Sequence, residues 1–381
     1  MIHYIAGPNS SPRHALAAAR RLGCAAPVLL RRRGTRLGWI AQERRREAFD
    51  PHEAQQHWRR GEAVLLPGAL KAALPKHRAA VRQTARFAER LAQGADPAEL
   101  LMRAPYARRL TAHFDMLASY RNEGDAQEIA TVEFDALKAG RVVSDNIWMK
   151  AAWLSFDEKD ASLRLRFSFG IADIDDVSRD LARQRHAAML AQTLFPECTL
   201  VANNVALTRQ LETILQARNL EFLERILYFN APNGGAQFHH DVERGHRGVV
   251  FAQLTGRTAW LAAPKPVLVD EMRSFCANLS AAEWQTMLPN RREARALQQC
   301  VQSPRALASF FDERDNTPVE TVLNRVPAFT RRLVERGLAF LLQPGDVLLL
   351  PQRNIDTCCW HAVFCAGDVF GQALSFAIRA R

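Results

Sequence analysis

The sequence lacks the features that would place the protein in a membrane or outside the cell. No apolar run approaches the ~18 residues that cross a bilayer, and the opening MIHYIAGPNSSPRH has no charged start and apolar stretch of a signal peptide. The seven cysteines are odd in number, irregularly spaced and without a C-x-x-C pair, which indicates neither a disulfide framework nor a structural zinc site. We therefore expect a cytoplasmic protein without a membrane partner.

Motifs for nucleotides and nucleic acids are also missing. There is no G-x-G-x-x-G, zinc-finger or RNP motif. Charge is nevertheless uneven, because residues 1–120 hold 21 Lys/Arg and 9 Asp/Glu, whereas the remainder holds 30 and 31. The clusters Arg31–Arg33 and Arg44–Arg46 could attract an acidic peptide, a nucleic acid or an anionic small molecule, or could simply be solvated. The missing motifs make nucleic acid the least favoured of these partners.

With 381 residues, 48% hydrophobic, the chain can form one large domain or two ordinary ones. The first 120 residues predict a mixed but mostly helical region. Its strand candidates are short, and its helical spacing is clearest over two segments. The strand candidates are HYIA, APVLL and LGWIAQ, and the predicted helices cover 77–94 and 96–120.

From about residue 125 the pattern changes to alternating strands, with helices predicted over 175–194 and 205–219. Segments such as ASLRLRFSF, LERILYFN and GVVFAQL alternate or are continuously apolar, and residues 266–338 are largely helical by pattern. A β-rich part interrupted by one helical insertion predicts a barrel or jelly roll whose edges are closed.

The stretch QFHHDVERGHRG, residues 237–248, carries the candidate chemistry. Side chains alternate along a strand, so His239 and Asp241 share one face and His240 points to the other. His361, after the motif G-D-x-L-x-x-P, is the candidate third ligand. Two histidines and one carboxylate on one face suit Fe(II) and leave coordination positions open, unlike a closed structural zinc site. The alternative for the three ligands is a set of unrelated polar residues, and for His246 we expect a solvated turn rather than a place on the metal.

The segments NAPNGGAQFHHD…FAQLTGRTAWLAAP and LLQPGDVLLLP…WHAV resemble the cupin-like JmjC family of Fe(II)- and 2-oxoglutarate-dependent oxygenases. The resemblance is close over 225–265 and 338–381. It implies an α+β fold with a double-stranded β-helix (jelly-roll or cupin) core, surrounding helices and a helical insertion between barrel strands. The oxygenase domain would then cover 121–381, with 1–120 a basic N-terminal region that binds substrate or a partner.

The resemblance also implies roles for particular residues. The three catalytic iron ligands are matched by His239, Asp241 and His361. The positions that line the co-substrate pocket are matched by Tyr228 and Asn230.

One position departs from the family pattern. Thr258 stands where the family usually has a basic residue, two positions before Trp260, that pairs with the far carboxylate of 2-oxoglutarate. Arg257 and Arg379 are the alternative candidates for this anchor, because a dicarboxylate needs a cation.

The resemblance predicts an Fe(II)/2-oxoglutarate-dependent dioxygenase that hydroxylates a C–H bond on a peptide or protein side chain. An acidic substrate would bind through residues 1–120, and a homodimer is left open. A small amino-acid-like or natural-product substrate is the first alternative, and a non-catalytic metal-binding cupin is the second. Cys358 and Cys359 are interpreted as small buried hydrophobes, with a thiolate ligand or a redox-sensitive thiol as the alternative.

Overall fold

The computed structural model describes residues 1–44, 49–154, 162–170, 179–243, 245–313 and 316–380. Of the predicted features, Arg45 and Arg46, Arg244 and the beginning of the helix expected at 175 lie outside these residues. Within them, the search for helices that could cross a membrane finds none of sufficient length and apolar character.

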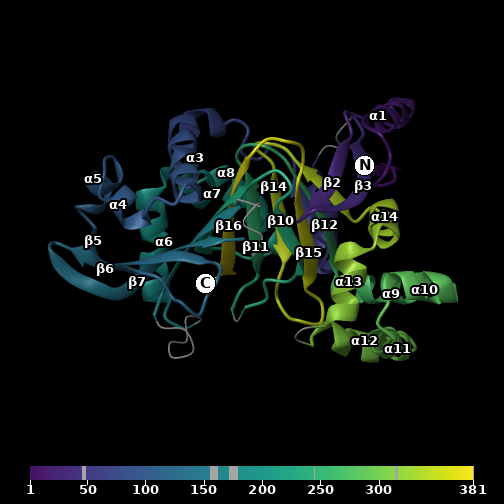
Figure 1. Ribbon diagram of the computed structural model, residues 1–381. Helices are drawn as coiled ribbons and strands as arrows, with labels where there is room; N and C mark the ends of the chain where they lie inside the picture. The colour runs from purple at the N-terminus through teal and green to yellow at the C-terminus, as the bar shows by residue number, and fades with distance from the viewer. Residues whose placement is uncertain (45–48, 155–161, 171–178, 244, 314–315, 381) are drawn as a thin grey trace.

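Three antiparallel sheets form the framework (Figure 1). The largest has nine strands, in the order β4 (Val64–Leu66), β14 (Val347–Pro351), β11 (Gly248–Gln253), β16 (Gly371–Ala380), β9 (Leu220–Asn230), β8 (Leu163–Phe169), β7 (Arg141–Trp153), β6 (Glu128–Lys138) and β5 (Phe114–Tyr120). The second has four, in the order β10 (Gly235–His239), β15 (Cys359–Cys365), β12 (Thr258–Pro264) and β13 (Ala339–Leu342). A small N-terminal sheet has the order β1 (Ile2–Ala6), β3 (Thr35–Gln42) and β2 (Val28–Arg32).

From β9 onward the chain passes back and forth between the two larger sheets. Consecutive strands change sheet at every step except from β12 to β13. The inner faces of the two sheets meet in an apolar layer, where the ring of Phe251 on β11 lies 4.5 Å from that of Trp260 on β12. The fold is therefore mixed α and β, with two large antiparallel sheets facing each other.

Helices cover the outer face of the nine-stranded sheet. Their apolar sides share one core with that sheet, as where Phe195 contacts Phe87 and Phe167. The helices are α2 (Pro51–Arg59), α3 (Arg78–Ala92), α4 (Pro97–Leu101), α5 (Tyr106–Leu110), α6 (Leu181–Leu194), α7 (Thr199–Ala202) and α8 (Val205–Leu215). The remaining N-terminal helix, α1 (Pro12–Arg21), packs on β1 and β3.

The predicted helical insertion lies between β12 and β13. It packs on the outer face of the four-stranded sheet together with the N-terminal sheet (Figure 1). The buried carboxylate of Glu271 ties α9 to α14 and the residue after it, since it accepts hydrogen bonds from Arg332 and Arg336. Its helices are α9 (Lys265–Ala277), α10 (Ala281–Met287), α11 (Arg291–Cys300), α12 (Pro304–Phe311), α13 (Thr317–Arg325) and α14 (Pro327–Glu335).

The helix predicted over 96–120 is wrong in its second half. Only α4 and α5 form, and residues 114–120 form β5, which pairs with β6 in the register Phe114↔Ala136. Strand pairing with a distant segment overrides the local helical spacing. The N-terminal region also supplies β4 to the nine-stranded sheet, at its edge beside β14. The domain boundary near residue 120 stays a prediction.

The predicted basic cluster Arg31–Arg33 makes contacts within the chain. Arg31 pairs with Asp368, and Arg33 donates a hydrogen bond to the carbonyl of Leu154 at 2.8 Å. Arg32 is buried, stacks over Phe364 and donates hydrogen bonds to the carbonyl of Ala236 and to the side chain of Asn324. These three guanidinium groups therefore attach the N-terminal sheet to the rest of the molecule.

Candidate metal centre

The three predicted metal ligands come from two neighbouring strands of the four-stranded sheet. His239 ends β10 and lies directly opposite His361 on β15 in the antiparallel register. Asp241 follows two residues after the end of β10. Gly235 allows β10 to begin this close to β15, because a Cβ at this position would collide with the backbone of Val363. Strand pairing therefore places the two imidazoles side by side, and the chain after β10 brings the carboxylate to them.

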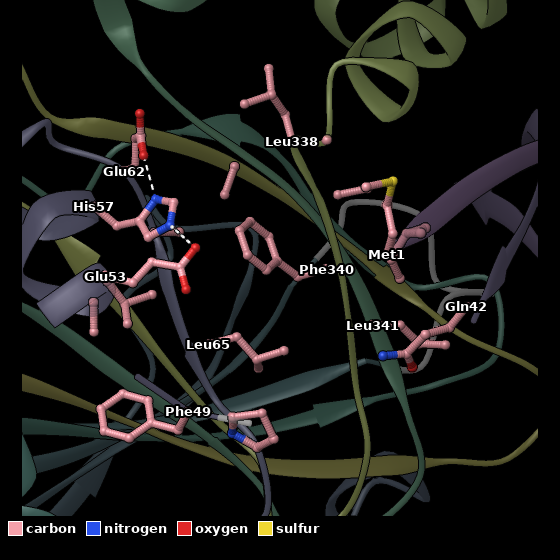
Figure 2. Close-up of a pocket in the computed structure, with 18 of the residues that line it drawn as sticks. Met1, Gln42, Phe49, Glu53, His57, Glu62, Leu65, Leu338, Phe340 and Leu341 are labelled. Carbon is pink, nitrogen blue, oxygen red and sulfur yellow. Dashed lines mark hydrogen bonds and ion pairs between the residues drawn. The ribbon is translucent and has the colours of Figure 1, made fainter. Parts of the chain in front are cut away.

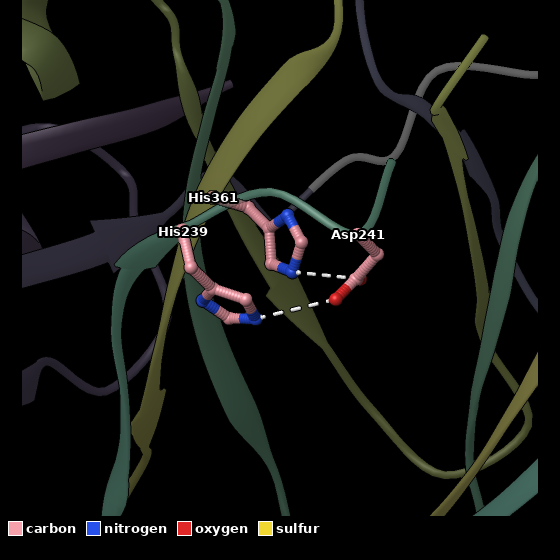
Figure 3. Close-up of side chains that lie close together, drawn as sticks. All are labelled: His239, Asp241 and His361. Atoms are coloured by element: carbon pink, nitrogen blue, oxygen red, sulfur yellow. Dashed lines mark ion pairs between the residues drawn. The ribbon is translucent and has the colours of Figure 1, made fainter. Parts of the chain in front are cut away.

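The side chains of His239, Asp241 and His361 converge (Figure 3). One ligand atom from each lies within 4.8 Å of the others. The Nε2 atom of His239 is 3.6 Å from one carboxylate oxygen of Asp241, and Nε2 of His361 is 3.4 Å from the other. His361 is 3% exposed, whereas the side chains of His239 and Asp241 are 41% and 39% exposed. The site is thus buried on one side and accessible on the other.

The hydrogen bonds of the two imidazoles show which nitrogen faces the centre. Nδ1 of His239 is 2.7 Å from the carbonyl of Gln237, and Nδ1 of His361 is 3.3 Å from the carbonyl of Cys359. A carbonyl can only accept, so in the neutral imidazoles Nδ1 carries the proton and Nε2 has a free lone pair. Two nitrogen lone pairs and a carboxylate then face one another with no donor from the described residues between them, an arrangement that a cation stabilises.

The electrostatics favour the protonation states that a metal requires. Burial, reinforced by His239, lowers the pKa of His361 to about 4, so this imidazole is neutral at pH 7. Burial opposes ionisation of Asp241, but the charges that His361 and His239 carry when protonated outweigh this effect and hold the pKa of Asp241 below its ordinary value. Neutral imidazole and ionised carboxylate are the forms that bind a divalent cation.

Two further residues hold the ligands in place. Trp260 stacks on the His361 ring, with centroids 5.3 Å apart and the planes inclined at 27°. Gln352 is fully buried, accepts a hydrogen bond from the backbone N–H of Asp241 at 3.3 Å and donates one to the carbonyl of Cys359 at 2.7 Å. Gln352 was not predicted from the sequence, although it directly follows the G-D-x-L-x-x-P motif.

The triad borders a cavity between the two large sheets. Its other lining residues are Leu154, Tyr228, Asn230, Ala236, Val249, Phe251, Trp260, Leu350, Val363 and Ser375. Most of them are apolar, but the side chains of Tyr228, Asn230 and Ser375 are polar and make no hydrogen bond with any residue that the structure describes. The cavity therefore offers hydrogen-bonding groups to a small polar ligand beside the triad. Tyr228 and Asn230 lie where the family resemblance expects them, and their role stays a prediction.

The three candidates for the carboxylate anchor are not among the residues that line this cavity. Thr258 is buried, and its hydroxyl donates to Gln253 at 2.7 Å and accepts from Nε1 of Trp260 at 2.9 Å. Arg257 lies in the turn before β12, near Gly367. Arg379 lies at the far end of β16, with a guanidinium nitrogen 4.0 Å from Glu224. Their assignment to the co-substrate stays a prediction that these positions do not support.

The other histidines of the motif point elsewhere. His240 packs against Trp360, with ring centroids 5.2 Å apart, on the side of the insertion. The expectation that His246 lies in a solvated turn is wrong. His246 is 5% exposed, and its Nε2 lies 2.8 Å from Glu224. The pairing with β9, a distant strand, decides this placement.

The two neighbouring cysteines are buried core residues. Cys358 and Cys359 are 1% and 0% exposed. Burial raises the pKa of both thiols, that of Cys358 to about 12. Neither belongs to the candidate metal groups among the described residues. These observations agree with the interpretation of both cysteines as small hydrophobes.

A second, wider cavity lies away from the triad, between α2, β4 and β13 (Figure 2). Its floor is apolar, with Leu65 and Phe340, and its rim carries His57, hydrogen-bonded to Glu62 at 2.5 Å. The acids of this rim are therefore already engaged with neighbouring basic groups, since Arg60 also pairs with Glu62 at 2.8 Å.

No protein-family model matches the sequence, and no curated protein does. The chain is similar to the crystal structure of an oxidoreductase of the 2OG-Fe(II) oxygenase family from Burkholderia pseudomallei, with a TM-score of 0.29 and 9% identity over 88% of this chain and 93% of that chain. It is also similar to the Escherichia coli ribosomal oxygenase YcfD, with a TM-score of 0.28 and 12% identity over 88% of this chain and 53% of that chain. The chain thus spans about half of the E. coli protein.

Proposed function

We propose that the protein is an Fe(II)/2-oxoglutarate-dependent dioxygenase that hydroxylates a C–H bond. The observation that carries this proposal is the convergence of His239, Asp241 and His361, all acceptors, beside a cavity with open polar groups. We propose further that β9 to β16 form a double-stranded β-helix. The alternation of these strands between two facing sheets supports it.

The donor set fits iron. Two imidazoles and one carboxylate suit Fe(II) and occupy only three positions, so others stay open for a 2-oxo acid and O2. The bound iron and co-substrate would supply the oxidising chemistry. The protein itself orients the ligands. The carbonyls of Gln237 and Cys359 orient the two imidazoles, and Gln352 orients the backbone of Asp241. Tyr228, Asn230 and Ser375 would donate hydrogen bonds to the co-substrate, while the apolar lining excludes water.

A peptide or protein side chain is the proposed substrate. The exposure of His239 and Asp241 supports this, because a side chain carried by a large molecule can reach a site that is open on one side. A small amino-acid-like or natural-product substrate is the alternative. Cytoplasmic localisation and a homodimer stay predictions.

The surface of α3 supports an acidic partner. Four arginines stand four residues apart on this helix, are exposed, and form no ion pair with any residue in the described ranges: Arg78, Arg82, Arg86 and Arg90. Residues at this spacing lie along one side of a helix, so the four guanidinium groups form a continuous basic stripe. The double variant Arg82→Glu/Arg86→Glu is expected to raise KM for an acidic protein substrate and to leave KM for 2-oxoglutarate unchanged.

The test of the function is an anaerobic titration of Fe(II) and 2-oxoglutarate into metal-free protein, followed by a turnover assay. We expect a visible charge-transfer band in the wild type and its loss in His239→Ala and Asp241→Ala. On admission of O2, succinate should form in the wild type alone. Iron binding without the band and without succinate would overturn the proposal.

That outcome would favour a second candidate, a non-catalytic metal-binding cupin. The specific observation behind it is that, among the residues that the structure describes, no Lys or Arg lines the cavity. A cupin of this kind would bind a divalent metal with the same triad and consume no 2-oxo acid.

A further inference from the structure

A groove lies at the beginning of α3, beside the short 3-10 helix Pro196–Cys198. Its volume of about 640 Å³ falls within the range of pockets that hold drug-sized ligands, roughly 300–1,000 Å³. The lining residues are Lys76, His77, Ala79, Ala80, Arg82, Gln83, Arg86, Arg109 and Pro196. Four of these nine are Lys or Arg, and none is Asp or Glu. Among the residues that the structure describes, the groove is thus lined by charge of one sign.

The four cations of the groove are of two kinds. Arg109 is half-buried and held in place, because its guanidinium donates hydrogen bonds to the carbonyl of Leu194 at 2.6 Å and to the side chain of Gln83 at 2.9 Å. The other three are exposed, and no ion pair joins them to any residue in the described ranges. The groove therefore combines one fixed guanidinium with three cations that can meet an anion from outside the molecule.

The acid that directly follows the groove residue Pro196 does not neutralise this charge. Glu197 is fully buried, and its carboxyl group accepts a hydrogen bond from Gln372 at 3.1 Å. Burial raises the pKa of this carboxyl, which favours its uncharged form. The positive charge of the groove is therefore available to a ligand.

The spacing of two of the cations matches that of an extended chain. Arg82 and Arg86 stand four residues apart on α3, and the Cβ atoms of helical residues at this spacing are about 5–6 Å apart. In an extended peptide, alternate side chains project to the same side and are about 6–7 Å apart. Acidic residues at alternate positions of an extended segment can therefore meet Arg82 and Arg86 in turn.

Two other anionic ligands fit the groove less well. Single-stranded nucleic acid is bound with its bases stacked on aromatic side chains, and no Phe, Tyr or Trp is among the residues lining the groove. A single small anion needs cations that converge on one point, whereas Arg82 and Arg86 follow one another along α3. An acidic polypeptide segment is the ligand that the lining favours.

We propose that this groove binds an acidic segment of the protein substrate, extended and with Asp or Glu at alternate positions. The inference rests on the proposed function, and it narrows the contact with an acidic partner from the stripe on α3 to one groove with a sequence pattern. α3 covers the outer face of the nine-stranded sheet, whereas the triad borders the space between the two large sheets (Figure 1). The docking segment is therefore separate, in the substrate, from the side chain that is hydroxylated.

The experiment measures the dissociation constants of two labelled peptides of about nine residues, with blocked ends and the same composition, by fluorescence anisotropy. One peptide has three Asp at alternate positions, and the other has them at every third position, so that successive Asp side chains of the extended chain project to opposite sides. The wild type should bind the first about 5-fold more tightly, since it forms one more exposed ion pair. Arg82→Glu/Arg86→Glu should lower the affinity for the first peptide about 10-fold, because two ion pairs are replaced by like charges.

The matched control is Arg20→Glu/Arg21→Glu, which makes the same change of net charge at two exposed positions of α1. It should change the affinity for the first peptide by less than about 2-fold, since charges beyond the Debye length are screened. An equal loss in the two double variants overturns the inference, because the attraction would then come from the overall charge. Equal binding of the two peptides by the wild type overturns it as well.

A third ligand separates polypeptide from nucleic acid. A four-nucleotide RNA with three phosphodiester groups carries the same charge as the peptides and should bind more weakly than the first of them. Tighter binding of the RNA, with loss in Arg82→Glu/Arg86→Glu, overturns the inference and gives the groove to nucleic acid. None of these titrations needs iron or turnover, so their failure leaves the charge-transfer band and succinate formation as separate tests of the proposed function.

Discussion

Among the residues that the structure describes, two groups of histidine and carboxylate side chains each bring their ligand atoms together, but the surroundings of the two groups differ. One is His239, Asp241 and His361, and the other is Glu224, Glu243 and His246. Both bring three potential ligand atoms within 4.8 Å of one another. By this criterion alone the two groups are equivalent.

Their hydrogen bonds and neighbouring charges separate them. In the second group Nε2 of His246 meets Glu224 at 2.8 Å, and the guanidinium groups of Arg166 and Arg379 stand 3.9–4.0 Å from the two carboxylates. Burial and the neighbouring Glu224 raise the pKa of Glu243, which favours a shared proton between the two acids. The carboxylates therefore already have cations and donors within the protein.

In the first group the imidazole protons are committed to backbone carbonyls, and the lone pairs face inward. Proximity of ligand atoms is thus insufficient to identify a metal site. The informative quantity is whether any donor or cation of the protein already satisfies the acceptors. On this view the first group is the proposed metal centre, and the second is an internal ion-pair cluster that holds the segment after Asp241 onto β9.

The strongest test of this contrast is metal binding itself. Asp241→Ala should lower the affinity for Mn(II), a redox-stable substitute for iron, by more than the ~100-fold that changes outside the ligand shell cause. Glu224→Ala should leave that affinity within a few-fold of the wild type. Isothermal titration of both variants measures this, and a large loss in Glu224→Ala would contradict the division.

The free energy of unfolding should show the opposite order, with the larger loss in the second group. Glu224→Ala leaves buried His246 without its partner, and removal of one member of a buried pair destabilises by about 3 kcal/mol. Urea unfolding of metal-free protein measures this difference. Asp241→Ala should cost the metal-free fold much less, since its carboxylate is 39% exposed and faces two acceptors. Equal losses in the free energy of unfolding of the two variants would show that the two groups contribute equally to the stability of the fold.

A substitution at Gln352 tests whether hydrogen bonds from a residue that does not itself bind the metal contribute to metal affinity. Gln352→Ala removes the hydrogen bonds to Asp241 and Cys359, and we expect metal affinity to fall about 10- to 100-fold. Gln352→Glu is the control that keeps the acceptor for the Asp241 N–H and loses the donor. An unchanged affinity in Gln352→Ala would show that Gln352 serves only packing.

The last expected effect is a pH dependence of the stability of the metal-free protein. His361 has a pKa of about 4 in the fold and about 6.5 when unfolded, so between these values the unfolded state binds a proton that the fold does not. Metal-free protein should therefore lose stability as pH falls from 6.5 to 4, by at most about 1.4 kcal/mol per pH unit from this residue. His361→Gln should reduce the slope of the free energy of unfolding in this window. The same slope in both proteins would mean that other histidines control it.

The local sequence pattern was sufficient to choose the three candidate ligands, but it was not sufficient to choose the residues that surround them. His239, Asp241 and His361 follow from alternation and from the motif before His361, and the structure brings them together. Gln352 and Ser375 could not be chosen by this reasoning, because a buried Gln after a Pro and a Ser in an apolar strand carry no local signal. The insertion was predictable because helical spacing persists over its whole length.

The incorrect predictions have one physical origin. Residues 114–120 have helical spacing, yet they form a strand because β6 is available to pair with them. His246 has the surroundings of a turn, yet it is buried because Glu224 reaches it from β9. The arginines at 31–33, for which a binding role stays a prediction, likewise have partners distant in the chain, about 200 residues or more away at Ala236 and Asp368.

The sequence by itself determined the strand alternation, the helical insertion and the identity of three candidate ligands, because these depend on spacing along a few neighbouring residues. Only the tertiary structure decided which acceptors lack a donor and which charges are compensated. Those facts depend on the register between strands distant in the chain, and a shift of one residue would turn each of these side chains to the other face of the sheet.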